Sequence, residues 1–393
     1  MAGGWGLRVY VAASSVMLLV LSWSIVAPIF PLYVRSLGAS TLLLGFLMAL
    51  SSLVSLILRI PLSALSDRVG RVRMLLIGLL IASSSSLLYA YASSSLQLLP
   101  IVVYQSIPFA YFNPVAASIV SDLAPMRRRG DVMGRYLTSP SLGLVLGPML
   151  CSLLVDRLGY RGLFLISALF PLIGLLLLIL LPPRVPEGEV ERPGVKASLR
   201  EVAMDRDILI LSYCRASFST SHSIFATLFS LYAVESLGLT PSQVAALFTL
   251  RGVTNVIVRP PAGRLSDRLG RRLPLAAAYG VVASSYLLIA RVGALPIIAL
   301  GLLLYGLAWG VRAVSEWAYL ADVARPEVRT IAFSYLSTVF GLGSTLGGVL
   351  AGALSTVMPY GDIFLLSAFL NMPPIPLILR MRASPSGLHQ SGE

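Results

Sequence analysis

Runs of about twenty apolar residues recur along the whole chain and are separated by short polar stretches. A helix of that length crosses the hydrocarbon core of a bilayer. Lipid offers no hydrogen-bond partners to a backbone, so repeated runs of this kind fold as helices that satisfy their own amides. With 56% hydrophobic and 12% charged residues, the chain is predicted to be an all-α polytopic membrane protein.

Hydropathy and loop signals predict twelve membrane-spanning segments. Their expected bounds are 9–34, 41–65, 72–92, 96–122, 132–156, 160–182, 206–235, 241–263, 273–292, 296–322, 330–356 and 360–380. Most connections are short, but the stretch PPRVPEGEVERPGVKASLREVAMDR (182–206) is charged and not membrane-like. The sequence therefore predicts a six-helix bundle over 1–182, a linker over 183–205 and a second six-helix bundle over 206–393.

Arginines are concentrated in the loops that follow even-numbered spans. These loops hold Arg68, Arg71, Arg73, Arg127, Arg128, Arg129, Arg264, Arg268, Arg271, Arg272, Arg325 and Arg329, whereas the opposite loops hold only Arg35, Arg157, Arg161 and Arg291. The positive-inside rule then places both termini and the linker in the cytoplasm of a multi-pass plasma-membrane protein. The net charge of +13 is explained by topology and by contact with lipid headgroups, so no nucleic-acid partner is expected.

The two halves repeat each other at an offset of 200 residues. RIPLSALSDRVGR begins at position 59 and RPPAGRLSDRLGR at position 259, and eight of thirteen positions are identical. The same offset relates VRSLG (34–38) to VESLG (234–238). Both halves begin on the same side, so they are predicted to be parallel repeats related by an axis along the membrane normal.

The twelve spans, the central linker and the two copies of the loop motif resemble the major facilitator superfamily over essentially the whole chain. The resemblance implies a secondary transporter with two six-helix bundles, a small-molecule substrate between them and rocker-switch alternating access. It implies no enzymatic activity, no catalytic residue and no cofactor. We also expect a monomer in the lipid bilayer.

The loop motif is expected to form a cytoplasmic gate. An ordinary positively charged loop ended by a glycine explains the arginines but not the aspartates or the second copy. In the family the aspartate meets the end of a neighbouring helix and basic partners, which favours the state closed to the cytoplasm. The resemblance assigns this role to Asp67, Arg68, Gly70, Arg71, Asp267, Arg268, Gly270 and Arg271, with Asp122, Arg129, Asp322 and Arg329 as partners across the gate.

Glycines at matching positions in spans five and eleven predict close helix packing. Gly143 and Gly147, like Gly343 and Gly347, have the GxxxG spacing that lets backbones approach in lipid. The run from Gly143 to Pro148 also resembles a motif of drug–proton antiporters, although Cys151 stands where that motif usually has another glycine.

Charged residues inside the spans identify the candidate transport site. Arg215, Arg251 and Arg312 lie roughly 13–17 Å from the nearest helix end, and Glu316 can pair with Arg312 at i,i+4. An arginine at that depth costs at least about 2.5 kcal/mol unless it has a partner or a polar cavity. A structural salt bridge around Glu316 is the alternative, but it neutralises one arginine and leaves two. We therefore favour a substrate or proton site.

The first half contributes uncharged polar residues at comparable depth, notably Trp23, Gln105 and Asn113. In the family, spans one, four, seven and ten line the central cavity, which also places Trp309 there. Aromatic residues of span ten can equally be packing residues. The two cysteines and two histidines are too few and too separated for a metal site.

The sequence lacks a nucleotide-binding Walker motif, so a proton gradient is the expected energy source, with Glu316 as the switch. Export of an amphiphilic or anionic molecule is favoured because arginines are in surplus. Span one carries no acidic residue, unlike many drug–proton antiporters, which argues against drug efflux by that route. The alternatives are an uptake symporter or uniporter of the same fold, or a non-transporting sensor or scaffold.

Overall fold

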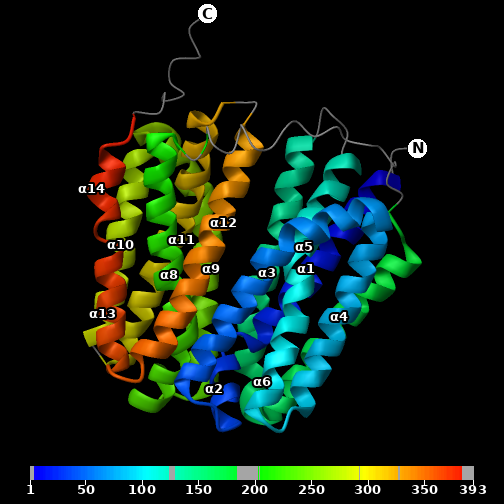
Figure 1. Ribbon diagram of the computed structural model, residues 1–393, viewed down its shortest axis with the longest axis horizontal. Coiled ribbons are helices and arrows are strands. Elements are labelled where there is room, and N and C mark those ends of the chain that lie inside the picture. The colour runs from blue at the N-terminus through cyan, green and yellow to red at the C-terminus, as the bar shows by residue number, and fades with distance from the viewer. Residues whose placement is uncertain are drawn as a thin grey trace, which may run out of the picture. The chain divides into compact units, whose positions relative to one another are not determined.

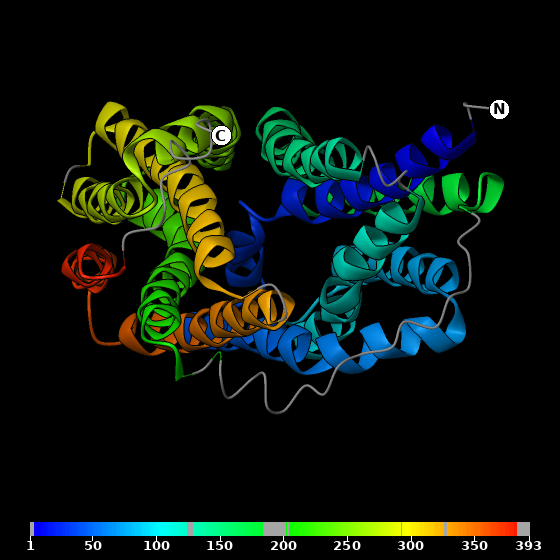
Figure 2. The same cartoon turned by 90° about the horizontal axis from the view of Figure 1, so that it is seen from above.

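A computed structural model describes residues 4–123, 129–183, 202, 204–291, 293–325 and 328–382. In this part of the chain every element of regular structure is helical (Figure 1). The helices form two compact units. The first comprises Met1–Glu189 with Ala233–Thr249, and the second comprises Val190–Tyr232 with Leu250–Glu393. Figure 2 shows the helices of each unit gathered as a bundle.

The first unit holds the helices drawn from blue to cyan-green in Figure 1. Their bounds are α1 (Gly4–Val26), α2 (Phe30–Ser36), α3 (Thr41–Val69), α4 (Arg71–Tyr91), the 3₁₀ turn η1 (Ser95–Gln97), α5 (Leu98–Leu123) and α6 (Arg129–Leu180). The helix α6 contains two predicted spans, because the backbone leaves helical geometry at Gly159 (φ 61°, ψ −174°). A positive φ of this kind favours glycine.

The second unit holds most of the remaining helices. Their bounds are α8 (Arg206–Leu231), the π-helical turn η3 (Tyr232–Ser236), α9 (Pro241–Leu269), α10 (Arg272–Arg291), α11 (Leu295–Val323), α12 (Arg329–Leu354), α13 (Tyr360–Leu370) and α14 (Pro374–Leu379). The dividing line between the units falls inside η3 and α9. The last predicted span is split into α13 and α14, where prolines remove backbone donors.

All twelve predicted segments coincide with helices, so the fold class is confirmed. Of the described helices, nine are long and apolar enough to cross a membrane on composition alone, and α8 and α9 are not among them. The helix α8 is rich in serine, and hydroxyls such as Ser212 donate to the preceding turn of their own helix (Ser212 Oγ to Ile208 O, 2.7 Å). The linker predicted over 183–205 lies largely outside the described residues.

The paired glycines lie where two helix backbones meet in each unit. In the first unit, a Cβ added at Gly147 would lie 2.6 Å from the carbonyl carbon of Ser24 on α1. In the second, a Cβ at Gly347 would lie 2.3 Å from the carbonyl oxygen of Thr220 on α8. A hydroxyl reinforces each crossing, since Ser24 Oγ donates to Gly143 O (2.6 Å) and Thr220 Oγ1 donates to Gly343 O (3.1 Å). The first and fifth spans of each half therefore pack in the same way.

Candidate functional site

One buried carboxylate in the second unit is shared by two arginines. Glu316 on α11 accepts a hydrogen bond at Oε1 from Arg215 on α8 and at Oε2 from Arg312, one turn earlier on α11. The side chains are 1%, 8% and 3% exposed for Glu316, Arg215 and Arg312. The sequence predicted the pairing with Arg312, and the structure adds Arg215 as a second partner of the same carboxylate. The group of Arg215, Arg312 and Glu316 is named the ion triad below.

Each arginine of the ion triad also rests on an aromatic ring. The guanidinium carbon of Arg312 lies 3.8 Å from the ring centroid of Phe218, and that of Arg215 lies 4.3 Å from the ring centroid of Trp317. Stacking of this kind attracts a cation to the ring face and is strongest where water is excluded. The rings therefore stabilise guanidinium charge that burial would otherwise disfavour.

The third intramembrane arginine, Arg251 on α9, lies over a different set of rings. Its guanidinium carbon is 5.3 Å from the ring centroid of Phe225, 5.4 Å from Trp309 and 5.9 Å from Tyr305. The side chain is partly exposed, unlike those of the ion triad. Together with the ion triad, Arg251 brings the cluster to three guanidinium groups and one carboxylate, a net charge of +2.

The structure adds His222 to this site, a residue that the sequence excluded as a metal ligand and for which it gave no other role. The Nδ1 atom lies 2.8 Å from the hydroxyl of Tyr305, and the imidazole ring lies 4.7 Å from the ring of Trp309. The helical spacing of Phe218, His222 and Phe225 places them on one face of α8, and this spacing could have indicated that His222 belongs to an aromatic cluster. Tyr305 and Trp309 likewise occupy consecutive turns of α11.

The polar residues predicted in the first half belong to the other unit, and each of them contacts an aromatic side chain there. The ring of Trp23 meets the edges of Phe30 and Phe109 at 5.3 and 6.3 Å. Gln105 accepts a hydrogen bond at Oε1 from the hydroxyl of Tyr89 (3.0 Å). Asn113 is exposed and accepts from Tyr136 through its carbonyl oxygens. These three residues carry no charge to compensate a substrate ion.

In each unit the repeated loop motif places one arginine between two aspartates, with the same ion pairs. Arg71 bridges Asp67 (3.1 Å) and Asp122 (2.5 Å). At the equivalent positions Arg271 bridges Asp267 and Asp322, the latter at 3.2 Å. Burial disfavours the charge of Arg271, but both aspartates outweigh this and raise its pKa.

The other predicted gate residues that the structure describes take no part in these two sets of ion pairs. Gly70 and Gly270 adopt positive φ values of 102° and 77° at the α3–α4 and α9–α10 turns, where any other residue would be strained. Arg68, Arg268 and Arg329 are exposed, and the side chain of Arg129 lies outside the described residues. Asp322, expected to be a partner across the gate, pairs with Arg271 of the loop motif in the same half.

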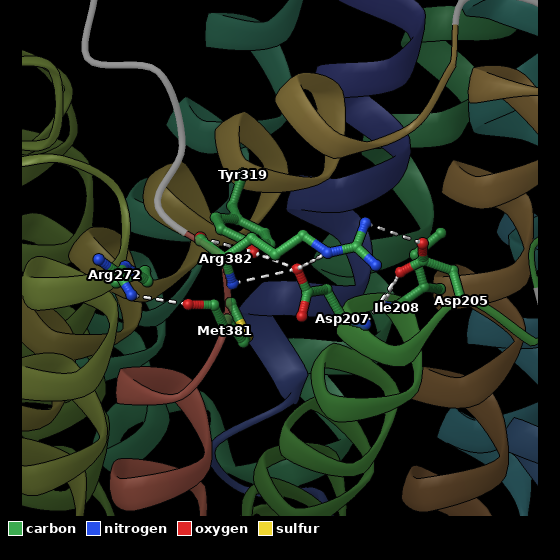
Figure 3. A network of polar contacts seen from close by, with 7 residues as sticks. All are labelled: Asp205, Asp207, Ile208, Arg272, Tyr319, Met381 and Arg382. Atoms are coloured by element: carbon green, nitrogen blue, oxygen red, sulfur yellow. Dashed lines mark hydrogen bonds and ion pairs between the residues drawn. The ribbon is translucent and has the colours of Figure 1, made fainter.

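A polar network that the sequence analysis missed joins the start of α8 to the end of α14 (Figure 3). Asp207 is fully buried, and its Oδ2 accepts from the hydroxyl of Tyr319 (2.8 Å) and from the amide of Arg382 (3.2 Å). Asp205 caps α8 by accepting from the amides of Asp207 and Ile208. Arg272 donates to the carbonyl of Met381 (2.6 Å). Figure 3 shows the side chain of Arg382 lying across both aspartates.

Replacing Asp207 with alanine is expected to lower the free energy of unfolding by about 1–3 kcal/mol, because the buried hydroxyl of Tyr319 and the partly buried amide of Arg382 lose their acceptor. Thermal unfolding of the purified variant measures this loss. Tyr319→Phe removes one of the two hydrogen bonds and is expected to cost about half as much. A wild-type melting temperature for Asp207→Ala would contradict a stabilising role of this network.

Sequence and structure comparisons identify similar proteins. The family model described as Major Facilitator Superfamily matches residues 12–221 and 209–391. An uncharacterized MFS-type transporter of Methanocaldococcus jannaschii is 24% identical over 358 residues, covering 88% of this chain and 91% of its own. The multidrug resistance protein MdtG of a Rahnella species is 26% identical over 380 residues, covering 93% and 90%.

Solved structures share the fold at lower sequence identity. The nucleoside transporter NupG superimposes with a TM-score of 0.81 at 12% identity, covering 95% of this chain and 99% of its own. A bacterial homologue of the lysosomal transporter Spinster gives a TM-score of 0.79 at 14% identity, covering 96% and 95%. These likenesses establish the architecture, while the chemistry of the site rests on the residues described above.

Proposed function

Because the chain belongs to the Major Facilitator Superfamily, we propose that it is a proton-coupled secondary transporter of an amphiphilic or anionic small molecule. Proteins of this family are membrane transporters, not enzymes. Rocker-switch alternating access is the mechanism we propose, with a monomer as the working unit. We further propose that both termini face the cytoplasm, as the arginine distribution favours.

The single observation that supports proton coupling is the position of Glu316 between two arginines. Of the residues that the structure describes in this cluster, it is the one acid, and its carboxylate is sealed from solvent. An intramembrane ionisable residue with named partners is the usual form of a proton relay in transporters. A proton on Glu316 removes one of its two charge-assisted acceptors and weakens its hold on Arg215 and Arg312.

Loss of that negative charge also changes the affinity of the cluster for a substrate. With Glu316 protonated the net charge of the cluster rises from +2 to +3, which favours an anion. Binding free energies are reciprocal, so an anion bound at the arginines favours protonation of Glu316 by the same amount. The proton and an anionic substrate are therefore expected to bind to this site cooperatively, each raising the affinity for the other.

We propose export as the direction of transport, because MdtG and other relatives are named multidrug resistance proteins. Export by antiport requires that the substrate and the proton exclude each other. The ion triad favours the opposite linkage for an anionic substrate, and this observation supports a second candidate, proton–anion symport. The two candidates differ in the sign of their response to a pH gradient.

The ion pairs of the loop motif are proposed to act in the conformational cycle. Arg71 holds Asp67 and Asp122 together in one half, and Arg271 does the same in the other. Partly exposed pairs of this kind contribute little to stability. We therefore propose that they brace the helix ends that move as the gate opens and closes.

Transport in proteoliposomes tests the proposal. The purified chain is reconstituted, and uptake of ethidium (a cation) and 1-naphthalenesulfonate (an anion) is followed under pH gradients of both signs. A proton antiporter accumulates the probe when the lumen is acidic, whereas a proton symporter accumulates it when the outside is acidic. One pH unit drives about a tenfold gradient for one proton per probe.

Protein-free liposomes and liposomes without a gradient are the controls. Accumulation in an acidic lumen establishes antiport, and accumulation from an acidic exterior establishes the symport candidate. If neither gradient moves either probe above the protein-free level, proton-coupled transport of this class of molecule is contradicted.

A further inference from the structure

Three side chains of the cluster are partly exposed, whereas the residues behind them are sealed. Arg251, His222 and Trp309 retain exposed surface, and they come from α9, α8 and α11. Phe218 and Tyr305 are fully buried behind them. The surface formed by Arg251, His222 and Trp309 is named the recognition surface below.

A hydrogen-bond chain lies behind His222. The hydroxyl of Tyr286 donates to that of Tyr305 (3.4 Å), which lies 2.8 Å from Nδ1 of His222, and we assign the proton of this second contact to Tyr305. The Nδ1 atom is then an acceptor, and a neutral imidazole carries its proton on Nε2. The three polar groups of the recognition surface, which are the Nε2–H of His222, the indole N–H of Trp309 and the guanidinium of Arg251, are therefore donors.

The aromatic faces that attract a cation already hold one. Arg251 lies over the rings of Trp309 and Tyr305, and Arg312 lies over the ring of Phe218. A cationic ligand would have to displace an arginine from these rings. The one carboxylate of the described cluster, Glu316, is 1% exposed and is held by two arginines. Among the described side chains of this cluster, a cation therefore finds no exposed carboxylate to pair with.

Donors and flat rings together define the complementary ligand. Trp309 and His222 lie with ring centroids 4.7 Å apart and planes inclined at 51°, and aromatic faces of this kind are surfaces on which a planar ring packs. The planar guanidinium of Arg251, whose Nε and Nη1 are buried, matches the geometry of a carboxylate.

We infer that the recognition surface binds an aromatic carboxylate, with the ring against Trp309 and His222 and the carboxylate on Arg251. This inference depends on the proposed function only in treating the recognition surface as part of the substrate site. It narrows an amphiphilic or anionic substrate to one chemical class. It also predicts that the chain does not carry lipophilic cations in either direction of transport.

Calorimetric titration of the purified full-length chain in lipid nanodiscs tests the inference without any gradient. Four probes are compared at pH 7.5, with empty nanodiscs to subtract partition into lipid. They are 2-naphthoate, its neutral analogue 2-naphthalenemethanol, the cation 2-naphthylmethylammonium and the non-aromatic anion cyclohexanecarboxylate. We expect 2-naphthoate to bind at least tenfold more tightly than each of the others.

Variants then assign the contacts. Arg251→Gln is expected to weaken 2-naphthoate at least tenfold while leaving 2-naphthalenemethanol unchanged. Trp309→Leu is expected to weaken 2-naphthoate and not cyclohexanecarboxylate. The matched control is Arg264→Gln, which removes an exposed arginine later on the same helix and is expected to leave all four affinities unchanged.

The wild-type series alone decides the inference, even if a variant does not fold. Equal or tighter binding of the cation or of the neutral analogue overturns it, and so does the absence of 2-naphthoate binding at millimolar concentration. Because no gradient is present, a carrier that binds 2-naphthoate but moves nothing would contradict the proposed transport and leave the ligand class standing. The reverse result would contradict the ligand class alone.

Discussion

Glu316→Gln is expected to abolish pH-driven transport and to lower the free energy of unfolding by about 3–5 kcal/mol. Glutamine keeps the shape of the side chain but leaves Arg215 and Arg312 buried without their common counter-charge. Removing one partner of a buried pair is costly because the remaining charge stays desolvated. Reconstituted uptake under a pH gradient and thermal unfolding in detergent measure the two effects.

A second substitution tests whether the stranded arginine charge causes the loss of stability. Adding Arg312→Leu to Glu316→Gln removes one of the two stranded charges and is expected to recover at least half of the lost stability. The transport defect is expected to remain, since no proton acceptor returns. If both variants lose the same stability, the ion triad does not behave as a coupled unit.

The surface offers a matched control for the same chemical change. Glu235 pairs with Arg35 at 3.3 Å, and both side chains are more than one third exposed. Glu235→Gln is expected to cost less than about 1 kcal/mol, because solvent screens an exposed pair. Wild-type stability together with full pH-driven uptake in Glu316→Gln would refute the role we assign to Glu316.

The architecture could be predicted because its signals are local or repeated. Apolar runs mark each span, and the helices coincide with all twelve. The offset of 200 residues aligned Asp67 with Asp267 and Asp122 with Asp322, and the structure gives both sets the same ion pairs. The GxxxG spacing likewise predicted helix contacts that the structure places at Gly147 and Gly347.

Contacts between helices could be predicted only where a family pattern supplied them. Helical periodicity places Glu316 one turn from Arg312 but says nothing of Arg215, which is 101 residues away on α8. The gate pattern grouped Asp122 with the loop motif, and its partner is Arg71 of that motif on another helix. The rotation of one helix against the next is decided by packing, which a single sequence does not display.

Two residues, His222 and Asp207, were not predicted for the same reason, since their partners lie on other helices. His222 was judged as a metal ligand and dismissed, yet its partner is a tyrosine hydroxyl on α11. Asp207 lies just beyond the predicted linker, and no role was predicted for it from the sequence. Its burial follows from Tyr319 and Arg382, which the fold brings to it from 112 and 175 residues away.

Gly347→Ala is expected to lower the free energy of unfolding by about 2–3 kcal/mol, although alanine is the better helix former. The added methyl group would lie 2.3 Å from the carbonyl oxygen of Thr220 and 3.0 Å from its carbon, both backbone atoms of α8. A backbone cannot rotate away as a flexible side chain does. The helices α8 and α12 must therefore separate and lose the packing that drives association in lipid.

Gly147→Ala tests the same contact in the other half, where the methyl group would meet backbone atoms of Ser24 and Ile25 at 2.6 and 2.7 Å. The matched control is Gly280→Ala in α10, whose methyl group would meet only the end of Ile375 at 3.8 Å. All three changes gain the same helix propensity, about 1 kcal/mol. Gly280→Ala is therefore expected to leave the melting temperature unchanged or to raise it, while the other two lower it. If all three variants melt alike, close approach of the backbones at the paired glycines does not stabilise the two units.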